Sequence, residues 1–302
     1  MSSVVLLCAG DIGHEALLRF VERHPDRLAG VCSYRVEPPQ EHALDRIREV
    51  AAAHAIPFHE GDARTALAEW RPDFAFAVKW RSLLPLDCAR RGLVVFHAAL
   101  LPRYRGFAPI PWPIINGETE SGVTMFYAAD EVDAGDIIDQ RSFAITDEDD
   151  AASVEQQVSR YVADMLVDNF AALEAGTAPR RAQDHRLATY CVWRGPDDGA
   201  IDWRAPSRRI HDLVRGLTRP YPGAFTTLGG RRLTVWKTTL ATADRAYVGS
   251  IPGRIERILP GTAVNVLTGD GIVGLVDVQL EGDAPRPAWE VITRLRTQLG
   301  GT

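Results

Sequence analysis

A histidine and an aspartate follow predicted strands in positions where folding could bring them together. The apolar run Leu93–Phe96 predicts a buried strand, and His97 stands at its end. Asp133 lies in an acidic loop between two further predicted strands, Val123–Tyr127 and Ile137–Ile138. An imidazole can accept and donate a proton near neutral pH, and a carboxylate can orient it. A lone histidine is also a common packing residue, so the residue types alone leave both roles open.

The elements around His97 alternate between strands and helices. Val4–Cys8 is a continuous apolar run, the turn Ala9–Gly13 follows it, and apolar spacing predicts a helix over Glu15–His24. Further strands are predicted over Leu28–Cys32, Pro57–His59 and Phe74–Val78, and further helices over Glu41–His54 and Asp147–Gly176. This order predicts an α/β fold with a doubly wound, mainly parallel sheet. Ligands bind such sheets at the carboxyl ends of the strands, where His97 is expected.

The pattern changes toward the C-terminus. Residues 178–193 are polar and rich in arginine and are predicted to form a linker along the surface, followed by a helix over Pro206–Leu217. Short strands with a hairpin turn at Thr268–Gly271 are then predicted over Ala224–Leu228, Leu233–Trp236, Gly253–Ile258, Ala263–Leu267 and Ile272–Leu280. We therefore predict two domains, residues 1–195 and residues 196–302, the second a small β-barrel.

Composition narrows the classes of function. The chain of 302 residues is long enough for two domains with their own cores, and its net charge of -6 disfavours broad binding to nucleic acid or to a membrane surface. The four cysteines contain no C-x-x-C pair, so they predict no metal site and fit a reducing compartment. No apolar stretch is long enough to span a membrane, and the first apolar run is too short for a secretory signal. We expect a cytoplasmic protein without a membrane, nucleic-acid or metal partner.

Three consecutive motifs carry a resemblance to a known family. The chain resembles the folate-dependent formyltransferases, whose signature is roughly N-x-H-x-S-L-L-P-x-[YW]-R-G, then N-G-E-x-x-x-G-V-T and D-x-G-x-I. The matching residues are His97, Leu100-Leu101-Pro102, Tyr104-Arg105-Gly106, Asn116-Gly117-Glu118, Gly122-Val123-Thr124 and Asp133 with Gly135 and Ile137. The segments G-A-I-D-W, I-H-D-L-V-R-G-L and R-P-Y-P-G-A-F look like those of members that formylate amino sugars on nucleotide carriers. The resemblance covers nearly the whole chain and implies a Rossmann-like catalytic domain with an OB-like C-terminal domain.

The resemblance implies a reaction for His97 and Asp133. The donor would be N10-formyltetrahydrofolate, used as a co-substrate, and the acceptor a primary amine. The amine attacks the formyl carbon, and His97 would accept the proton that the amine loses and later donate it to the departing folate nitrogen. Asp133 would orient and polarise His97, or order a water that relays the proton.

The resemblance also implies binding residues. Folate contacts are expected from Arg81, Leu83, Asp130, Val132 and Asp136, and contacts with the amine substrate from Gly10, Asp11, Tyr104 and Arg105. Simpler interpretations stay open, because Leu83 could be a core residue, Arg81 a surface ion pair, and the turn at Gly10 only a tight strand-to-helix connection.

One departure from the family pattern bears on the chemistry. The catalytic asparagine of the family, two residues before the histidine, is replaced by Val95, and no asparagine lies between Arg81 and Pro113. Valine cannot donate a hydrogen bond to an oxyanion. Three outcomes are open: a formyltransferase in which a water or a backbone N–H substitutes, a different folate-linked or nucleotide-sugar reaction in the same cleft, or a binding relative with little activity.

The acceptor is expected to be a nucleotide-linked amino sugar or a specialised-metabolite amine. Methionyl-tRNA formyltransferases share the two-domain plan, but they carry a basic loop after the second strand, whereas residues 33–42 are short and nearly neutral here. A methionyl-tRNA formyltransferase remains the alternative. Related proteins pair through C-terminal surfaces, so the resemblance also admits a homodimer.

Overall fold

The computed structural model describes residues 2–36, 43–241 and 247–300. The chain divides into two compact units. The N-terminal unit comprises Met1–Pro109, Glu120–Ala144 and Ser153–Val192, and the C-terminal unit comprises Ile110–Thr119, Ile145–Ala152 and Trp193–Thr302. Two short segments, residues 110–119 and 145–152, thus belong to the C-terminal unit although their sequence neighbours belong to the N-terminal unit. The functional boundary expected between residues 195 and 196 stays a prediction.

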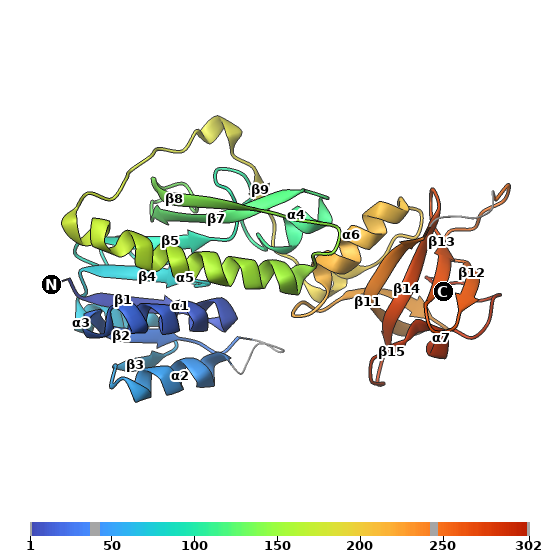
Figure 1. Ribbon diagram of the computed structural model, residues 1–302, viewed down its shortest axis with the longest axis horizontal. Coiled ribbons are helices and arrows are strands. Elements are labelled where there is room, and N and C mark those ends of the chain that lie inside the picture. The colour runs from blue at the N-terminus through green and yellow to red at the C-terminus, as the bar shows by residue number, and fades with distance from the viewer. Residues whose placement is uncertain (1, 37–42, 242–246, 301–302) are drawn as a thin grey trace. The chain divides into compact units, whose positions relative to one another are not determined.

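A seven-stranded sheet forms the centre of the N-terminal unit (Figure 1). Its strands are β1 (Val4–Cys8), β2 (Leu28–Ser33), β3 (Phe58–Glu60), β4 (Phe74–Val78), β5 (Gly92–His97), β7 (Glu120–Tyr127) and β8 (Ile137–Ala144). Their order is β3-β2-β1-β4-β5-β7-β8, with parallel pairing up to β5 and antiparallel pairing for β7 and β8. The expected mainly parallel, Rossmann-like sheet is confirmed.

Helices cover both faces of this sheet. They are α1 (Gly10–Arg23), α2 (Ala43–Ala53), α3 (Ala63–Trp70) and α5 (Ala151–Ala175). The ring of Phe20 in α1 contacts Phe76 of β4 and Phe170 of α5, which places α1 and α5 on one face. Ala66 and Leu67 of α3 pack with residues of opposite orientation in the strands, such as Ala75 and Ala77 of β4. The unit is therefore doubly wound, as predicted.

The predicted helices agree with the structure except at their ends. Helix α2 begins at Ala43, and the predicted residues Glu41 and His42 lie outside the described residues. Helix α3 was not predicted, because eight residues offer little periodicity; the carboxylate of Asp62 caps its first turn by accepting from the Arg64 N–H. Within the described ranges, no helix is both long and apolar enough to cross a bilayer.

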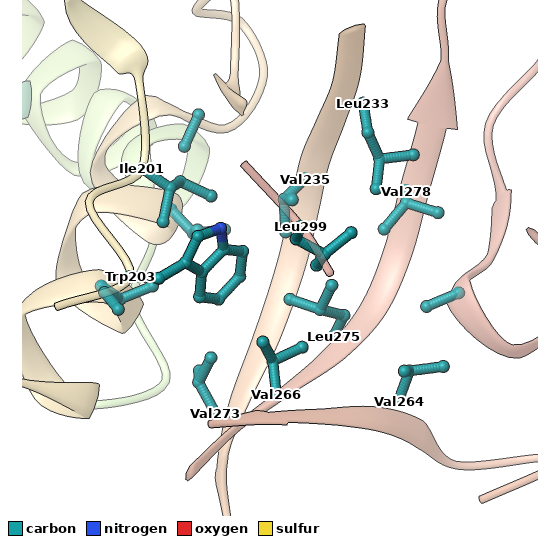
Figure 2. Close-up of a cluster of buried hydrophobic side chains, with 14 of the residues drawn as sticks. Ile201, Trp203, Leu233, Val235, Val264, Val266, Val273, Leu275, Val278 and Leu299 are labelled. Carbon is teal, nitrogen blue, oxygen red and sulfur yellow. The ribbon is translucent and has the colours of Figure 1, made fainter. Parts of the chain in front are cut away.

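An antiparallel sheet forms the core of the C-terminal unit. Its path is β10 (Ala224–Leu228), β11 (Arg231–Ala241), β14 (Ile272–Leu280), β13 (Ala263–Leu267) and β12 (Ile255–Leu259), and β15 (Arg286–Pro287) pairs with β14. Figure 2 shows the buried indole of Trp203 beside inward-facing side chains of these strands, including Val235, Val266 and Leu275. The predicted C-terminal β domain is confirmed as an antiparallel sheet, and its OB-like barrel character stays a prediction.

Short helices complete the C-terminal unit. They are α4 (Pro111–Ile115), α6 (Ser207–Leu217) and α7 (Ala288–Val291). Helices α4 and α6 pack closely. A Cβ on Gly216 would lie 2.8 Å from the Ile115 side chain, so glycine allows this approach. The buried guanidinium of Arg215 in α6 donates to Asp212 at 2.8 Å and to the carbonyls of Thr146 and Asp149. One side chain thus bonds two backbone carbonyls of residues 145–152.

Replacing Arg215 with methionine should destabilise the C-terminal unit by about 3 kcal/mol, because Asp212 would lose one of two cationic partners in a buried site. The free energy of unfolding from chemical denaturation measures the effect. Arg204→Met is the matched control: Arg204 pairs with Asp202 on the surface, with 83% of its side chain exposed, and should contribute less than about 1 kcal/mol. Equal losses for the two variants would contradict the importance of the buried pair.

Candidate active site

His97 lies at the carboxyl end of β5 and is 7% exposed. Its Nε2 is 2.7 Å from the carbonyl oxygen of Tyr104. A carbonyl oxygen only accepts hydrogen bonds, so Nε2 carries a proton and the lone pair of the neutral ring is on Nδ1. Nδ1 faces Asp133, whose Oδ2 is 3.6 Å away.

Asp133 reaches the site from the loop between β7 and β8. Its φ of 57° is in the left-handed region, which aspartate tolerates better than most residues. Its Oδ2 accepts a hydrogen bond of 2.8 Å from the backbone N–H of Gly106. The separation of 3.6 Å from His97 is too long for a hydrogen bond, so the orienting bond comes from Tyr104 and the carboxylate acts on the ring through its charge.

The His97 ring has an oxygen on each side. The Tyr104 carbonyl lies beside Nε2, and the Asp133 carboxylate lies beside Nδ1. The site therefore fixes one tautomer of the neutral ring and places a carboxylate beside its unprotonated nitrogen.

Thr124 and Gln140 hold the loop that follows His97. The hydroxyl of Thr124 donates to the Ala99 carbonyl at 2.6 Å and accepts from the Leu101 N–H at 3.1 Å. The amide of Gln140 donates to the Leu101 carbonyl and to the Thr124 hydroxyl. Strand β7 pairs Thr124 with His97, so these bonds fix the turn that leads to Tyr104.

Gly106 satisfies two requirements that explain the glycine of the R-Y-R-G turn. Its φ is 96°, and a Cβ there would lie 2.6 Å from the carbonyl oxygen of Cys191. Strand β6 (Arg105–Gly106) pairs in parallel with β9 (Tyr190–Cys191), which accounts for this close approach. The Gly106 N–H can therefore point at Asp133 while the backbone lies against β9.

The segment before β9 is largely exposed, as expected for a surface linker, but it also bonds to loops of the site. Arg181 forms a backbone bridge with Ile137 at the edge of β8, and Thr189 accepts from the backbone N–H of Arg105 at 2.9 Å. The segment 178–192, hereafter the strap, thus joins two loops of the site, and Figure 1 shows it running from α5 past β8 to β9. Its polar composition hid this role, because its bonds are mainly to the backbone of distant residues.

Arg105 is 1% exposed and lies within this framework. Its guanidinium donates to the side-chain oxygens of Gln183 at 2.7 Å and Glu131 at 3.2 Å, and it also contacts Tyr190 and His185. It therefore holds the loop together, and its expected contact with substrate remains a prediction. The same applies to Tyr104, whose observed contribution is its carbonyl.

Gln183 is a buried residue of the site that sequence analysis did not identify. Its Nε2 donates to the carbonyls of Asp133 at 2.9 Å and Gly135 at 2.8 Å, while its Oε1 accepts from Arg105. No spacing or motif in the sequence distinguishes this glutamine from a solvated one.

The predicted folate residues after β4 are on the surface. Leu83 is 73% exposed, which argues against a core role, and its carbonyl accepts from Arg64. Arg81 is also exposed. The hydroxyl of Tyr34 donates to the Lys79 carbonyl at 2.9 Å and fixes the start of this loop; burial raises the pKa of Tyr34, and Arg81 opposes that rise. The exposed side chain of Leu83 thus follows β4 at the end of the parallel strands where His97 ends β5.

The other predicted folate residues lie around Asp133. Asp130 is exposed, and Val132 is 49% exposed. Asp136 faces Arg180 at 3.8 Å, and that guanidinium lies 3.6 Å from the centre of the Tyr127 ring. Val132 therefore offers a second exposed apolar side chain, on the loop that carries Asp133.

The turn after β1 lies at the same edge of the sheet. Gly10 is buried with a φ of 63° and begins α1. Asp11 forms an ion pair with Arg46 of α2, and both side chains are about half exposed. Because β1 and β5 both run parallel to β4, the turn after β1 lies at the same end of the strands as His97.

Val95 is on the same face of β5 as His97, two residues earlier. It packs against the apolar cluster of Leu101, Phe126 and Ile137. The position taken by the family asparagine is thus apolar in its neighbours as well as in its own side chain. Over the described residues, no cluster of histidine, cysteine, aspartate and glutamate is placed to hold a metal ion.

Two family models match this chain. The chain matches the family described as formyl transferase over residues 20–169 and the formyl transferase C-terminal domain over residues 195–296. It is 33% identical to the methionyl-tRNA formyltransferase of Geobacter metallireducens over 316 aligned residues, which cover 99% of this chain and 97% of that protein. It is 40% identical to the methionyl-tRNA formyltransferase of Solibacter usitatus over 203 residues, covering 67% of this chain and 63% of that protein.

A solved structure shares the fold. The N-formyltransferase from Helicobacter canadensis, in complex with folinic acid and dTDP-3-aminofucose, superposes with a TM-score of 0.71 at 20% identity. The superposition covers 91% of this chain and 99% of the other. At this identity the likeness supports the fold alone.

Substituting Gly135 with alanine should displace the Asp133 loop, because the new Cβ would lie 1.7 Å from the carbonyl oxygen of Tyr127. We expect a loss of about 2 kcal/mol in the free energy of unfolding, measured by chemical denaturation. Gly249→Ala is the control: a Cβ there meets nothing within 4 Å, so the change should stay within about 0.5 kcal/mol. An unchanged stability of Gly135→Ala would show that the loop is not held as tightly as described.

Proposed function

The chain belongs to the formyltransferase family, and from this premise we propose that it transfers a formyl group from N10-formyltetrahydrofolate to the primary amine of a nucleotide-linked amino sugar or a related small metabolite. The family match confirms the enzyme class and the folate co-substrate expected from the sequence. The identity of the acceptor and the roles of individual residues belong to the proposal, as does the assignment of catalysis to residues 1–195 and of an accessory OB-like domain to residues 196–302.

The observation that carries the proposal is the environment of His97. With Nε2–H bonded to Tyr104, Nδ1 is the nitrogen available to accept a proton from the attacking amine, directly or through a water. The new C–N bond forms at the formyl carbon and gives a tetrahedral intermediate. The imidazolium, stabilised by Asp133, then returns the proton to N10 of the folate as the C–N10 bond breaks.

The folate is assigned to the surface between the loop after β4 and the Asp133 loop. Leu83 and Val132 are exposed apolar side chains that can cover a pterin, and the exposed backbone near Arg81 can bond its edges. Asp130 and Asp136 are carboxylates on the same loop as Asp133 and are assigned to polar groups of the folate. Gly10, Asp11, Tyr104 and Arg105 remain assigned to the acceptor side, the last through its hold on the turn.

Val95 limits the rate in this proposal. Loss of one oxyanion donor costs about 100- to 1000-fold in rate in other acyl-transfer enzymes. The apolar cluster around Val95 supplies no side-chain donor in its place. A water or a backbone N–H therefore has to bond the developing oxyanion, and formyl transfer is slow or matched to an unusually reactive amine.

Two acceptors are supported by different observations. The fold of the Helicobacter canadensis protein, solved with a nucleotide-linked amino sugar, supports a small acceptor. Methionyl-tRNA is the second candidate, because a methionyl-tRNA formyltransferase is 33% identical along almost the whole chain. Residues 193–302 also carry 15 lysine and arginine against 11 aspartate and glutamate residues, a balance that suits a polyanion better than the chain as a whole does.

The test compares the two acceptors in the same assay. Purified protein with N10-formyltetrahydrofolate is offered a dTDP-linked 3-amino sugar or methionyl-tRNA, and formylated product is quantified by mass spectrometry. The proposal expects product from the amino sugar and a rise in melting temperature with dTDP but not with tRNA. Product from methionyl-tRNA alone would assign the second function, and folate binding without turnover of any amine would indicate a binding protein.

Changing Val95 to asparagine should restore the missing donor and raise kcat for formyl transfer by about 100- to 1000-fold. Steady-state kinetics with the accepted amine measure the gain. His97→Ala is the companion variant, expected to lower kcat by about 100-fold or more while tetrahydrofolate affinity, measured by calorimetry, changes little. A Val95→Asn enzyme no faster than the parent would mean that another group already bonds the oxyanion.

A further inference from the structure

We propose that Gln183 is a positioning residue for the reaction, setting the location of the Asp133 carboxylate opposite His97. The inference rests on the proposed function, in which His97 is the base. Gln183 is 6% exposed and uses both amide hydrogens and its carbonyl oxygen within 3 Å of protein partners. It touches neither folate nor amine in this assignment, so it acts through Asp133.

Hydrogen bonds around Gln183 form a closed ring. The Arg105 guanidinium donates to Gln183, and Gln183 donates to the carbonyls of Asp133 and Gly135. The Asp133 carboxylate then accepts from the N–H of Gly106, which is bonded in sequence to Arg105. Each member of the ring restrains the next, so the carboxylate position depends on bonds made on the far side of its own loop.

The Asp133 backbone needs such a restraint. A non-glycine residue at a φ of 57° is in a sparsely populated conformation, which surrounding contacts have to maintain. Gln183 donates to the carbonyls of Asp133 and Gly135, which flank Ala134, and so restrains the backbone conformation of the loop. Without Gln183, Asp133 loses the bond to its carbonyl, and its carboxylate, which still accepts from Gly106, can move away from the 3.6 Å separation from Nδ1.

Two substitutions of Gln183 remove its hydrogen bonds to the carbonyls of Asp133 and Gly135. Gln183→Glu keeps an acceptor for Arg105 but presents a carboxylate to the two carbonyls, and Gln183→Met has a similar length without either kind of bond. Because a displacement of about 1 Å can lower a rate by about 100-fold, we expect kcat to fall by about that factor in both variants. The KM for N10-formyltetrahydrofolate should rise much less than kcat falls, because Gln183 makes no folate contact itself and acts on folate only through the loop that carries Val132.

Gln298 provides the matched control. Its Oε1 accepts from Arg254 at 2.9 Å and its Nε2 donates to the Pro252 carbonyl at 2.8 Å, so its bonding resembles that of Gln183, but it lies in the C-terminal unit. Gln298→Glu should lower the melting temperature comparably and leave kcat unchanged. The contrast separates positioning from a general loss of stability.

The outcomes are distinct. A selective loss of kcat in the Gln183 variants supports the inference, whereas an unchanged kcat, or parallel losses in kcat, KM and stability shared with Gln298→Glu, overturns it. If the parent enzyme formylates no amine, the proposed function fails, and crystal structures of the Gln183 variants decide the inference separately. A His97–Asp133 separation longer by about 1 Å supports it, and a separation that stays near 3.6 Å overturns it.

Discussion

The hydrogen bond from His97 Nε2 to the Tyr104 carbonyl is the interaction on which the site depends. It assigns the proton of the neutral ring to one nitrogen and leaves the other facing Asp133. Reversing the tautomer would place two lone pairs against each other at 2.7 Å, so this contact favours the tautomer with its proton on Nε2. The surrounding bonds keep the Tyr104 carbonyl and the Asp133 carboxylate at opposite nitrogens of this one ring.

Backbone geometry, more than side-chain chemistry, produces that arrangement. Gly106 and Gly135 stand where a Cβ would meet a carbonyl oxygen, and Asp133 holds a left-handed conformation between them. The strap adds Gln183 and strand β9, which close the framework from outside the sheet. His97 is thus held within a framework of backbone hydrogen bonds, which suits the orientation-dependent role that we propose for it.

Val95 makes this protein chemically different from the pattern it otherwise follows. His97 and Asp133 are both present, whereas the expected oxyanion donor is replaced by an isopropyl group among Leu101, Phe126 and Ile137. In the proposed reaction the transferred proton has His97 as its acceptor, whereas the developing negative charge has no side-chain donor at position 95. The acceptor and its reactivity therefore matter more here than in a member with the donor in place.

The sequence alone predicted the main strands and the sheet class and singled out His97 and Asp133, because apolar runs and local motifs record whatever depends on neighbouring residues. It could not show that Tyr104 rather than Asp133 orients the ring, since that bond comes from a backbone carbonyl common to every residue. It also concealed Gln183, whose partners are 78 and 48 residues away in the chain. Such contacts exist only after the strap has folded back along β8, so tertiary structure alone decided how the predicted residues are held.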